Sequence, residues 1–375
     1  MTDRVQDRGA GAPAPGSTRS APPSVAPALV GLDPESLAER LRDLPGGDRR
    51  FRGVQVFRWL HARHVTSFAA MTDLPASLRE GLAAHFRASE LEPVQTAHSE
   101  DTDTVKLVLR TRDGAEIETV RLGTPRRVTL CISSQVGCGF GCTFCRTATM
   151  GFGRNLEPGE IVDQILHVHR QAPLPDRYNL VFMGMGEPLA NLDHVIRATD
   201  LMQREEGLSI GPRRITVSTV GLVPEIERLA RERPRLRLAV SLTATTDAQR
   251  SALMPIGKRY PLDRLLEAVA FHVRHTRRRV TFEYVLLAGV NDSQDDARRL
   301  ARLSARVPCK VNLIPYNGAP GDRYRSPAPE VVERFRDYLM PRTYAVTVRA
   351  TQGRDILAAC GQLARTHDLR RSATR

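Results

Sequence analysis

The chain has 375 residues and carries 55 Lys and Arg against 42 Asp and Glu, a formal net charge of +13 at pH 7. Its length allows one large domain, or a large and a small one, with enough apolar residues for a core. The charge favours a polyanionic partner, nucleic acid before an anionic membrane surface; a general arginine bias of the source proteome is the alternative. No apolar run is long enough to span a membrane and no export signal begins the chain, so we expect a cytoplasmic protein.

The N-terminal part changes composition near residue 30. Residues 1–30 are rich in Ala, Pro, Gly and Ser, which predicts a disordered tail. Residues 31–95 have helical periodicity, and Asp33 followed by Pro34 is a good helix start. We therefore predict a small helical domain that docks RNA, with Trp59 in its core.

Three cysteines, Cys138, Cys142 and Cys145, are spaced Cys-x3-Cys-x2-Cys after the strand-like run Val128–Ser133. Thiolates in such a pattern suit an iron–sulfur cluster or zinc. Three of them leave one iron of a four-iron cube without a protein ligand and free to bind a small molecule. Structural zinc normally has four protein ligands, and the next His residues downstream lie inside the predicted helix Pro158–Arg170. The spacing favours the cluster, with zinc as the alternative.

From residue 104 to 365, strand-like and helix-like segments alternate in six β-then-α units, followed by a basic tail at 366–375. Such alternation predicts an α/β fold with parallel strands, either an open sheet or a partial barrel. Ligands in these folds gather at the C-terminal ends of the strands. The predicted strands are Val128–Ser133, Leu180–Met185, Ile215–Thr219, Leu236–Leu242, Val280–Leu287 and Lys310–Pro315; the helices are Pro158–Arg170, Leu192–Arg204, Val223–Arg231, Leu262–Arg274, Ser293–Ala305 and Glu330–Tyr338.

Several strings, in order and correctly separated, carry a family resemblance: CISSQVGCGFGCTFC, GFGRNL, FMGMGEPLAN, RRITVSTVG, LMPI, GVNDS and AACGQL. They resemble the RlmN/Cfr family of radical S-adenosylmethionine (SAM) enzymes, which methylate adenosine in large-subunit ribosomal RNA. The resemblance covers about residues 30 to 365. It implies an α/β fold, a radical SAM partial (β/α)6 barrel with a small N-terminal helical accessory domain. It also implies one [4Fe–4S] cluster per chain and SAM.

The resemblance assigns the cofactor ligands. The three cysteines would hold the cluster, and Glu187 would accept from the ammonium of SAM. Glycines before Glu187 would let the backbone approach SAM closely. Relatives usually have Ser-Leu-His where this chain has Ser241-Leu242-Thr243, a departure that a backbone contact would survive. The residues implied to bind SAM are Gly186, Glu187, Ser218, Ser241, Leu242, Thr243 and Asn317.

Three further residues match catalytic positions of the family. Cys360 matches a cysteine that carries the methyl group, which suits the chemistry because a thiolate attacks the methyl of SAM whereas electron-poor adenine carbon 2 does not. Cys131 matches the residue that forms a transient disulfide with Cys360, and Glu118 matches the proton acceptor. Cys309 is left as a core residue.

The expected substrate is carbon 2 of an adenosine in 23S rRNA. Methylation of carbon 8, as in the Cfr branch, stays open, as do transfer RNA as a second substrate and a non-catalytic, zinc-containing RNA-binding protein. Arg146–Met150 departs from the usual family string after the cysteines. We expect an electron donor such as flavodoxin or ferredoxin, no membrane partner and a monomer. Basic groups cluster at Arg121–Arg127, Arg204–Arg214, Arg231–Arg237, Arg274–Arg279 and Arg365–Arg375, and together these predict contacts to RNA phosphates.

Overall fold

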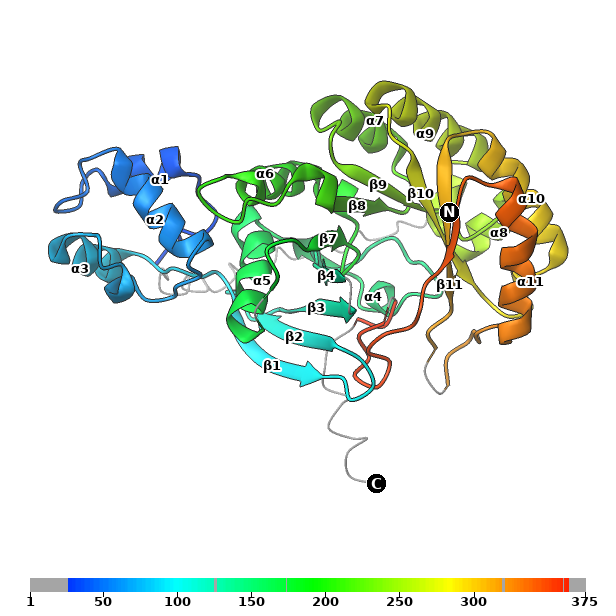
Figure 1. Ribbon diagram of the computed structural model, residues 1–375, viewed down its shortest axis with the longest axis horizontal. Coiled ribbons are helices and arrows are strands. Elements are labelled where there is room, and N and C mark those ends of the chain that lie inside the picture. Colours follow the sequence, from blue (N-terminus) through cyan, green and yellow to red (C-terminus); the bar gives the residue numbers. More distant parts are fainter. Residues whose placement is uncertain (1–25, 125–126, 173, 319–320, 360, 364–375) are drawn as a thin grey trace, which may run out of the picture.

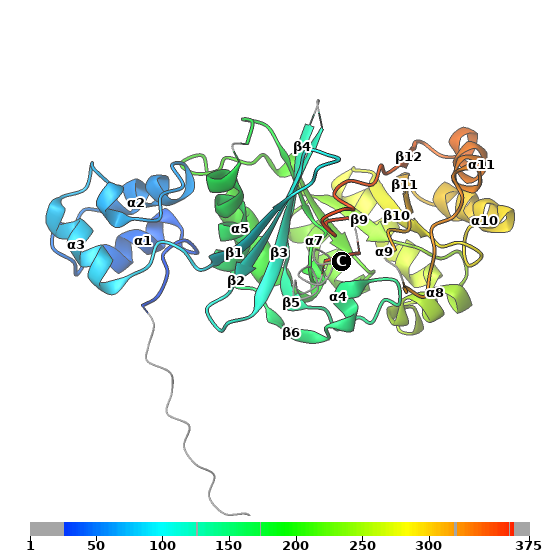
Figure 2. The same cartoon turned by 90° about the horizontal axis from the view of Figure 1, so that it is seen from below.

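The computed structural model describes residues 26–124, 127–172, 174–318, 321–359 and 361–363. A small helical domain lies at one end of the molecule, and a large sheet flanked by helices makes up the rest (Figures 1 and 2). No helix in the described ranges is long and apolar enough to cross a membrane. The basic tail at 366–375 lies outside the described residues.

The N-terminal helices are α1 (Pro34–Leu41), α2 (Phe51–His61) and α3 (Ala76–His85). Asp33 caps α1 by accepting from the Ser36 backbone N–H at 2.7 Å, as the sequence predicts. Trp59 is 8% exposed, and its indole N–H donates to Asp73 at 2.6 Å, so its placement in the core is confirmed.

Both predicted boundaries of this domain need correction. Leu29 and Val30 are buried, and the Leu29 N–H donates to the Arg87 carbonyl, so the helical domain begins before residue 31. The rest of the predicted disordered tail, residues 1–25, lies outside the described residues. At the other end, strand β1 begins at Glu92, inside the range predicted as helical. β1 is a mostly exposed edge strand, so its sequence lacks the apolar alternation that marks a strand.

The main sheet has ten strands in the order β1-β2-β3-β4-β7-β8-β9-β10-β11-β12. The first four pair antiparallel and the strands from β4 to β12 pair parallel. The strands are β1 (Glu92–His98), β2 (Thr104–Arg110), β3 (Glu116–Thr124), β4 (Arg127–Cys131), β7 (Asn179–Phe182), β8 (Ile215–Thr219), β9 (Arg237–Ser241), β10 (Val280–Leu286), β11 (Cys309–Pro315) and β12 (Val346–Val348).

One long helix separates each pair of successive parallel strands and packs on the outside of the curved sheet (Figure 1). These helices are α5 (Pro158–Gln171), α6 (Leu192–Gln203), α7 (Val223–Glu232), α9 (Leu262–Thr276), α10 (Gln294–Ala305) and α11 (Pro329–Leu339). The six predicted β-then-α units are therefore confirmed, and the fold is an α/β partial barrel.

Short elements that the sequence did not indicate surround the cysteines. A two-stranded sheet, β5 (Gln135–Gly137) with β6 (Phe152–Asn155), brackets the cysteine loop, which continues into α4 (Arg146–Thr149). Another short helix, α8 (Asp247–Leu253), follows β9. After β12 the C-terminal segment returns along the open side of the barrel, where Asp355 binds Ser99 and the Gly361 carbonyl accepts from the Arg146 N–H.

Candidate active site

The cysteine loop is held in place by its backbone. The Cys138 N–H donates to the Gly151 carbonyl at 2.8 Å, Thr143 N–H donates to Leu253, and Cys145 N–H donates to Cys142 at 3.1 Å. These bonds tie the loop both to the turn before β6 and to the segment after β9. All three predicted ligands therefore project from one braced loop.

Cys138 and Cys142 lie in an environment that opposes the ionisation of their thiols. Burial raises the pKa of Cys138 to about 11, and the charges of Cys145 and Glu187 add to the effect. Burial raises the pKa of Cys142 further, and the other two thiols again contribute. A positively charged iron–sulfur core would offset both burial and mutual repulsion. The donor set therefore fits a metal cluster.

A single metal ion fits this loop less well. In the part of the chain that the structure describes, no three His, Cys, Asp or Glu side chains are grouped so as to hold one ion. Thiolates of a four-iron cube each bind a different iron, so they need not converge on one point. Structural zinc needs a convergent tetrahedral set.

Beside the loop, a cavity of about 160 Å³ opens at the C-terminal ends of the parallel strands. Two aromatic side chains, Phe144 and Tyr316, also contribute to its wall. The predicted residues that the structure brings together in this cavity are Cys145, Gly186, Glu187, Ser218, Ser241 and Asn317.

Glu187 is the most strongly fixed side chain of the cavity. Its Oε1 accepts from the Leu189 N–H at 3.0 Å and its Oε2 from the Val220 N–H at 2.8 Å. Its own N–H donates to Gln135 Oε1 at 2.9 Å. Burial raises the pKa of Glu187 to about 7. A bound ammonium group would favour the charged carboxylate, so the site is suited to a cationic amine.

The glycines before Glu187 are required for a reason that the sequence did not indicate. A Cβ at Gly184 would lie 2.7 Å from the Ile132 carbonyl oxygen. A Cβ at Gly186, where φ is +100°, would lie 2.6 Å from Gln135 Cβ. Close packing against the segment after β4, rather than an approaching ligand alone, therefore excludes larger side chains.

Leu242 and Thr243 are completely buried and do not line the cavity, unlike their neighbour Ser241. Their carbonyls accept hydrogen bonds from buried side chains instead, that of Thr243 from Asn291 at 2.8 Å. The buried Arg250 guanidinium donates to the carbonyls of Ser241 at 3.0 Å and Leu242 at 2.7 Å, and also to that of Val220. Burial lowers the pKa of Arg250 to about 10. Sequence reasoning missed this residue because nothing in its short helix marks a buried arginine that joins two strand ends.

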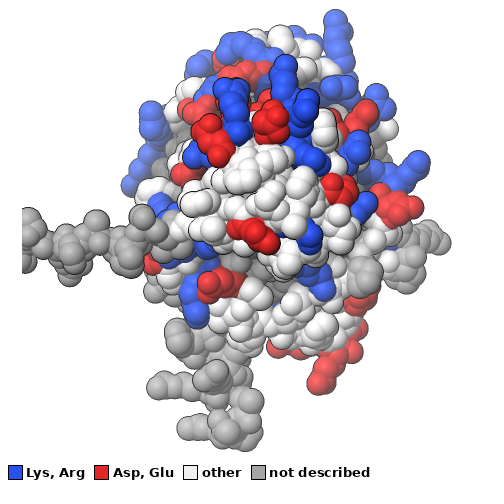
Figure 3. Space-filling model, turned by 90° about the vertical axis from the view of Figure 1, so that its left-hand side faces the viewer, with Lys and Arg blue, Asp and Glu red and all other residues white. Residues whose placement is uncertain are grey.

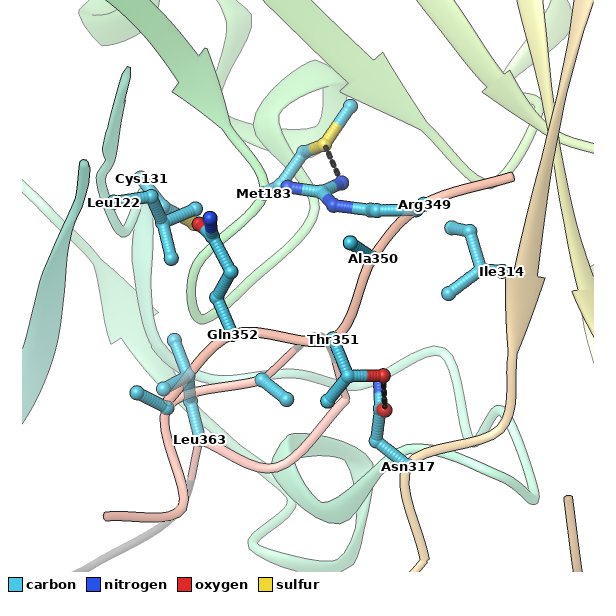
Figure 4. Close-up of a pocket in the computed structure, with 12 residues that line it drawn as sticks. Leu122, Cys131, Met183, Ile314, Asn317, Arg349, Ala350, Thr351, Gln352 and Leu363 are labelled. Atoms are coloured by element: carbon cyan, nitrogen blue, oxygen red, sulfur yellow. Dashed lines mark hydrogen bonds between the residues drawn. The ribbon is translucent and has the colours of Figure 1, made fainter. Parts of the chain in front are cut away.

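A second cavity adjoins the first (Figure 4). Cys131, at the end of β4, lines it together with Ala358 and Ala359. Cys360, the predicted methyl-carrying residue, lies outside the described residues. Asn317 lines both cavities and accepts from Thr351 Oγ1 at 2.8 Å, so it connects the strand-end cavity to the C-terminal segment.

Glu118 lies on β3 and lines neither cavity. Its side chain is 2% exposed and pairs with Lys106 at 3.3 Å. The Lys106 ammonium also donates to the Leu357 carbonyl at 3.4 Å, three residues before position 360. The structure thus connects Glu118 to the C-terminal segment through a buried cation.

Comparison with known proteins agrees with this geometry. A radical SAM superfamily model matches residues 132–301, and a ribosomal RNA large subunit methyltransferase N-terminal domain model matches residues 28–87. A dual-specificity RNA methyltransferase RlmN from Anaeromyxobacter dehalogenans is 52% identical over 90% of this chain and 92% of that protein. Another from Geobacter sulfurreducens is 50% identical over 89% and 92%.

Among solved structures, a radical SAM methyltransferase from Sphaerobacter thermophilus matches with a TM-score of 0.85 and 46% identity, over 90% of this chain and 98% of that one. The fold, the cysteine loop and the strand-end cavity define a radical SAM enzyme. More specifically, the chain belongs to the RlmN family of radical SAM RNA methyltransferases. Membership of the superfamily implies a [4Fe–4S] cluster and SAM as cofactors.

Proposed function

We propose that this protein methylates carbon 2 of an adenosine in 23S rRNA, through a methyl group carried by Cys360 and a transient disulfide between Cys360 and Cys131. The observation that carries the proposal is the contact between the two cavities. One holds Cys145 and Glu187, and the other holds Cys131 beside Ala359. Transfer RNA as a second substrate and a flavodoxin or ferredoxin as electron donor belong to the same proposal.

The chain's own groups would bind and orient the cofactors. Cys138, Cys142 and Cys145 would hold the cluster, and Glu187 would accept from the amine of SAM. Ser218, Ser241 and Asn317 supply hydroxyl and amide groups along the rest of the cavity. When bound, the cluster and SAM would supply a reductively generated radical that takes a hydrogen atom from the methyl group on Cys360.

The remaining steps fall to three side chains. Cys360 as a thiolate would take the methyl group from a first SAM, because sulfur is a far better nucleophile than adenine carbon 2. After the carbon joins the ring, Glu118 would remove the proton from carbon 2. The ring radical would return one electron to the bound cluster, and the Cys131 thiolate would then attack the Cys360 sulfur. The carbon–sulfur bond would break, the carbon would take up a proton to complete the methyl group of the released base, and the two sulfurs would be left as a disulfide that a cellular reductant reopens.

Nucleoside mass spectrometry of RNA treated anaerobically with the protein, reductant and SAM tests this function. We expect 2-methyladenosine, and we expect none from a Cys360→Ala variant that retains its iron. Product only at carbon 8 would favour the Cfr-type reaction. A protein that binds RNA, contains zinc and gives no product would support the non-catalytic alternative.

A further inference from the structure

Basic residues that are far apart in the sequence converge at the end of the barrel opposite the active site. Arg127 is the first residue of β4 and Arg237 is the first residue of β9. Arg214 directly precedes β8, Arg278 lies two residues before β10, and Lys310 is the second residue of β11. Parallel strands begin at one edge of a sheet and end at the other, so these five residues share one edge. We call them the basic rim.

A cavity of about 510 Å³ opens at the basic rim and extends along the strands to Met183, Arg349 and Gln352, which also line the second cavity of the candidate site. Arg127, Arg237 and Lys310 line it directly. Between these cations the wall carries groups that can donate hydrogen bonds, from Thr129, Asn179, Thr216, Thr281, Asn312 and Thr347. Glu283 also lines the cavity and accepts from Asn312; burial raises the pKa of Glu283, and the nearby charge of Arg349 opposes that shift.

The rim concentrates positive charge without local compensation. Burial lowers the pKa of Arg237, and the charges of Arg278, Arg214 and Arg127 lower it further, so each of these three arginines lies close enough to Arg237 to repel its guanidinium group. Elsewhere arginines are commonly paired, as Arg233 is with Asp200. Within the described part of the chain, no rim residue forms an ion pair with a carboxylate.

The helical domain does not concentrate charge in this way. At the end of the molecule where α1–α3 lie, basic and acidic side chains are interspersed around an uncharged central area (Figure 3). A polyanion would therefore find a more uniform positive surface at the rim than across that face.

We propose that the basic rim binds backbone phosphates of the substrate RNA, as a second contact far from the reacting base. The proposal rests on the proposed function only in taking RNA as the partner. Arg127, Arg237 and Lys310 are exposed and are spread over separate strands. This arrangement suits several successive phosphates, whereas one small anion would need donors that converge on it.

The separation between the two sites determines which RNA can reach both. Arg127 lies four residues before the end of β4 and Lys310 five residues before the end of β11, so the rim lies about 13–17 Å along the strands from the ends that form the active site, at ~3.3 Å per residue. A dinucleotide bound at the active site would be too short to reach the rim. A long, folded RNA would reach both sites.

Binding of RNA by an Arg237→Gln/Lys310→Gln variant, measured by fluorescence anisotropy without SAM or reductant, tests the rim. The matched control is Arg264→Gln/Arg334→Gln, which removes the same charge from exposed positions on α9 and α11. For a long ribosomal RNA fragment we expect the slope of log K against log salt to shrink by about 1.5. At 0.1 M salt that corresponds to roughly 10- to 30-fold weaker binding.

The control should bind the long fragment as the unsubstituted chain does, and both variants should bind a dinucleotide normally. Unchanged binding of the long fragment by the rim variant, or an equal loss in the control, would overturn the proposal. Saturable binding of tripolyphosphate that the rim variant loses, with RNA binding unaffected, would also overturn it by assigning the rim to a free anion. Because no turnover is involved, failure to methylate would count against the proposed function and leave this result standing.

Discussion

Lys106 on β2 and Glu118 on β3 form an ion pair at 3.3 Å with side chains only 3% and 2% exposed. They are diagonal neighbours on the two strands, because Lys106 lies opposite Val120 and Glu118 lies opposite Val108. The same ammonium reaches the Leu357 carbonyl. The carboxylate that we propose as the proton acceptor is therefore fixed by a cation that also holds the C-terminal segment.

Replacing Lys106 by Met should leave a charged carboxylate buried without this partner. We expect the free energy of unfolding, measured in urea, to fall by about 3–5 kcal/mol. Adding Glu118→Gln removes the stranded charge, so the double variant should recover much of that loss. If the double variant is no more stable than Lys106→Met, the pair does not act as described.

Replacing Cys131 by Ser should separate the steps of the proposed reaction. Without the resolving thiolate, we expect a covalent RNA–protein adduct at the position of the carried methyl group, and no turnover beyond it. Denaturing gel electrophoresis with labelled RNA detects that adduct. Cys309, which is buried and donates to the Ser304 carbonyl, gives the matched control, and Cys309→Ser should still turn over. Normal turnover by the Cys131 variant would contradict the disulfide step.

Replacing Gly186 by Ala should be much more harmful than the same change at Gly289. Both have positive φ, +100° and +69°, but a Cβ at Gly289 has open space around it. We expect Gly289→Ala to cost about 1–2 kcal/mol from its backbone conformation alone. Gly186→Ala should cost about 2–5 kcal/mol, because the new Cβ also collides with Gln135. Equal unfolding free energies in urea would show that this packing is not restrictive.

The buried His61 should make the protein less stable in mild acid. Burial lowers its pKa to about 3, against an ordinary value of 6.5, and its ring stacks on Phe57. Above pH 6.5 the ring is neutral in both the folded and the unfolded state, so His61 adds no pH dependence to the free energy of unfolding there. Below pH 6.5 only the unfolded state takes up the proton, and the free energy of unfolding falls by about 1.4 kcal/mol per pH unit down to the folded pKa.

His61→Phe removes this contribution. Between pH 6.5 and 5, its unfolding free energy should fall more gently with decreasing pH than that of the unsubstituted chain, by about 1.4 kcal/mol per unit. Urea unfolding at several pH values measures the difference. Parallel curves for the two proteins would show that His61 does not take up a proton on unfolding.

The sequence indicated the barrel well because its parallel strands are buried and its helices are amphipathic, so that β8 and α6 begin where their patterns predict. It indicated the site where side chains lie at a strand end or a few residues beyond one, as Ser241 and Glu187 do. It did not indicate β1, whose residues face solvent, or Arg250, whose role depends on two carbonyls from other strands.

The same limit explains two further differences. Thr243 follows the strand-end residue Ser241 but turns into the interior with a φ of +51°, a direction that no periodicity encodes. The basic rim assembles from separate sequence clusters, so only the order and direction of the strands bring Arg127 and Arg237 together.

The central claim is that three cysteines hold a four-iron cluster whose remaining iron binds SAM. Electron paramagnetic resonance of the anaerobically reconstituted, reduced protein, with and without isotopically labelled SAM, tests it most directly. We predict about four irons per chain, a spectrum that shifts when SAM is added, and coupling from its labelled amine or carboxylate to one iron. A cluster whose spectrum ignores SAM, or a colourless protein loaded with zinc, would contradict the account.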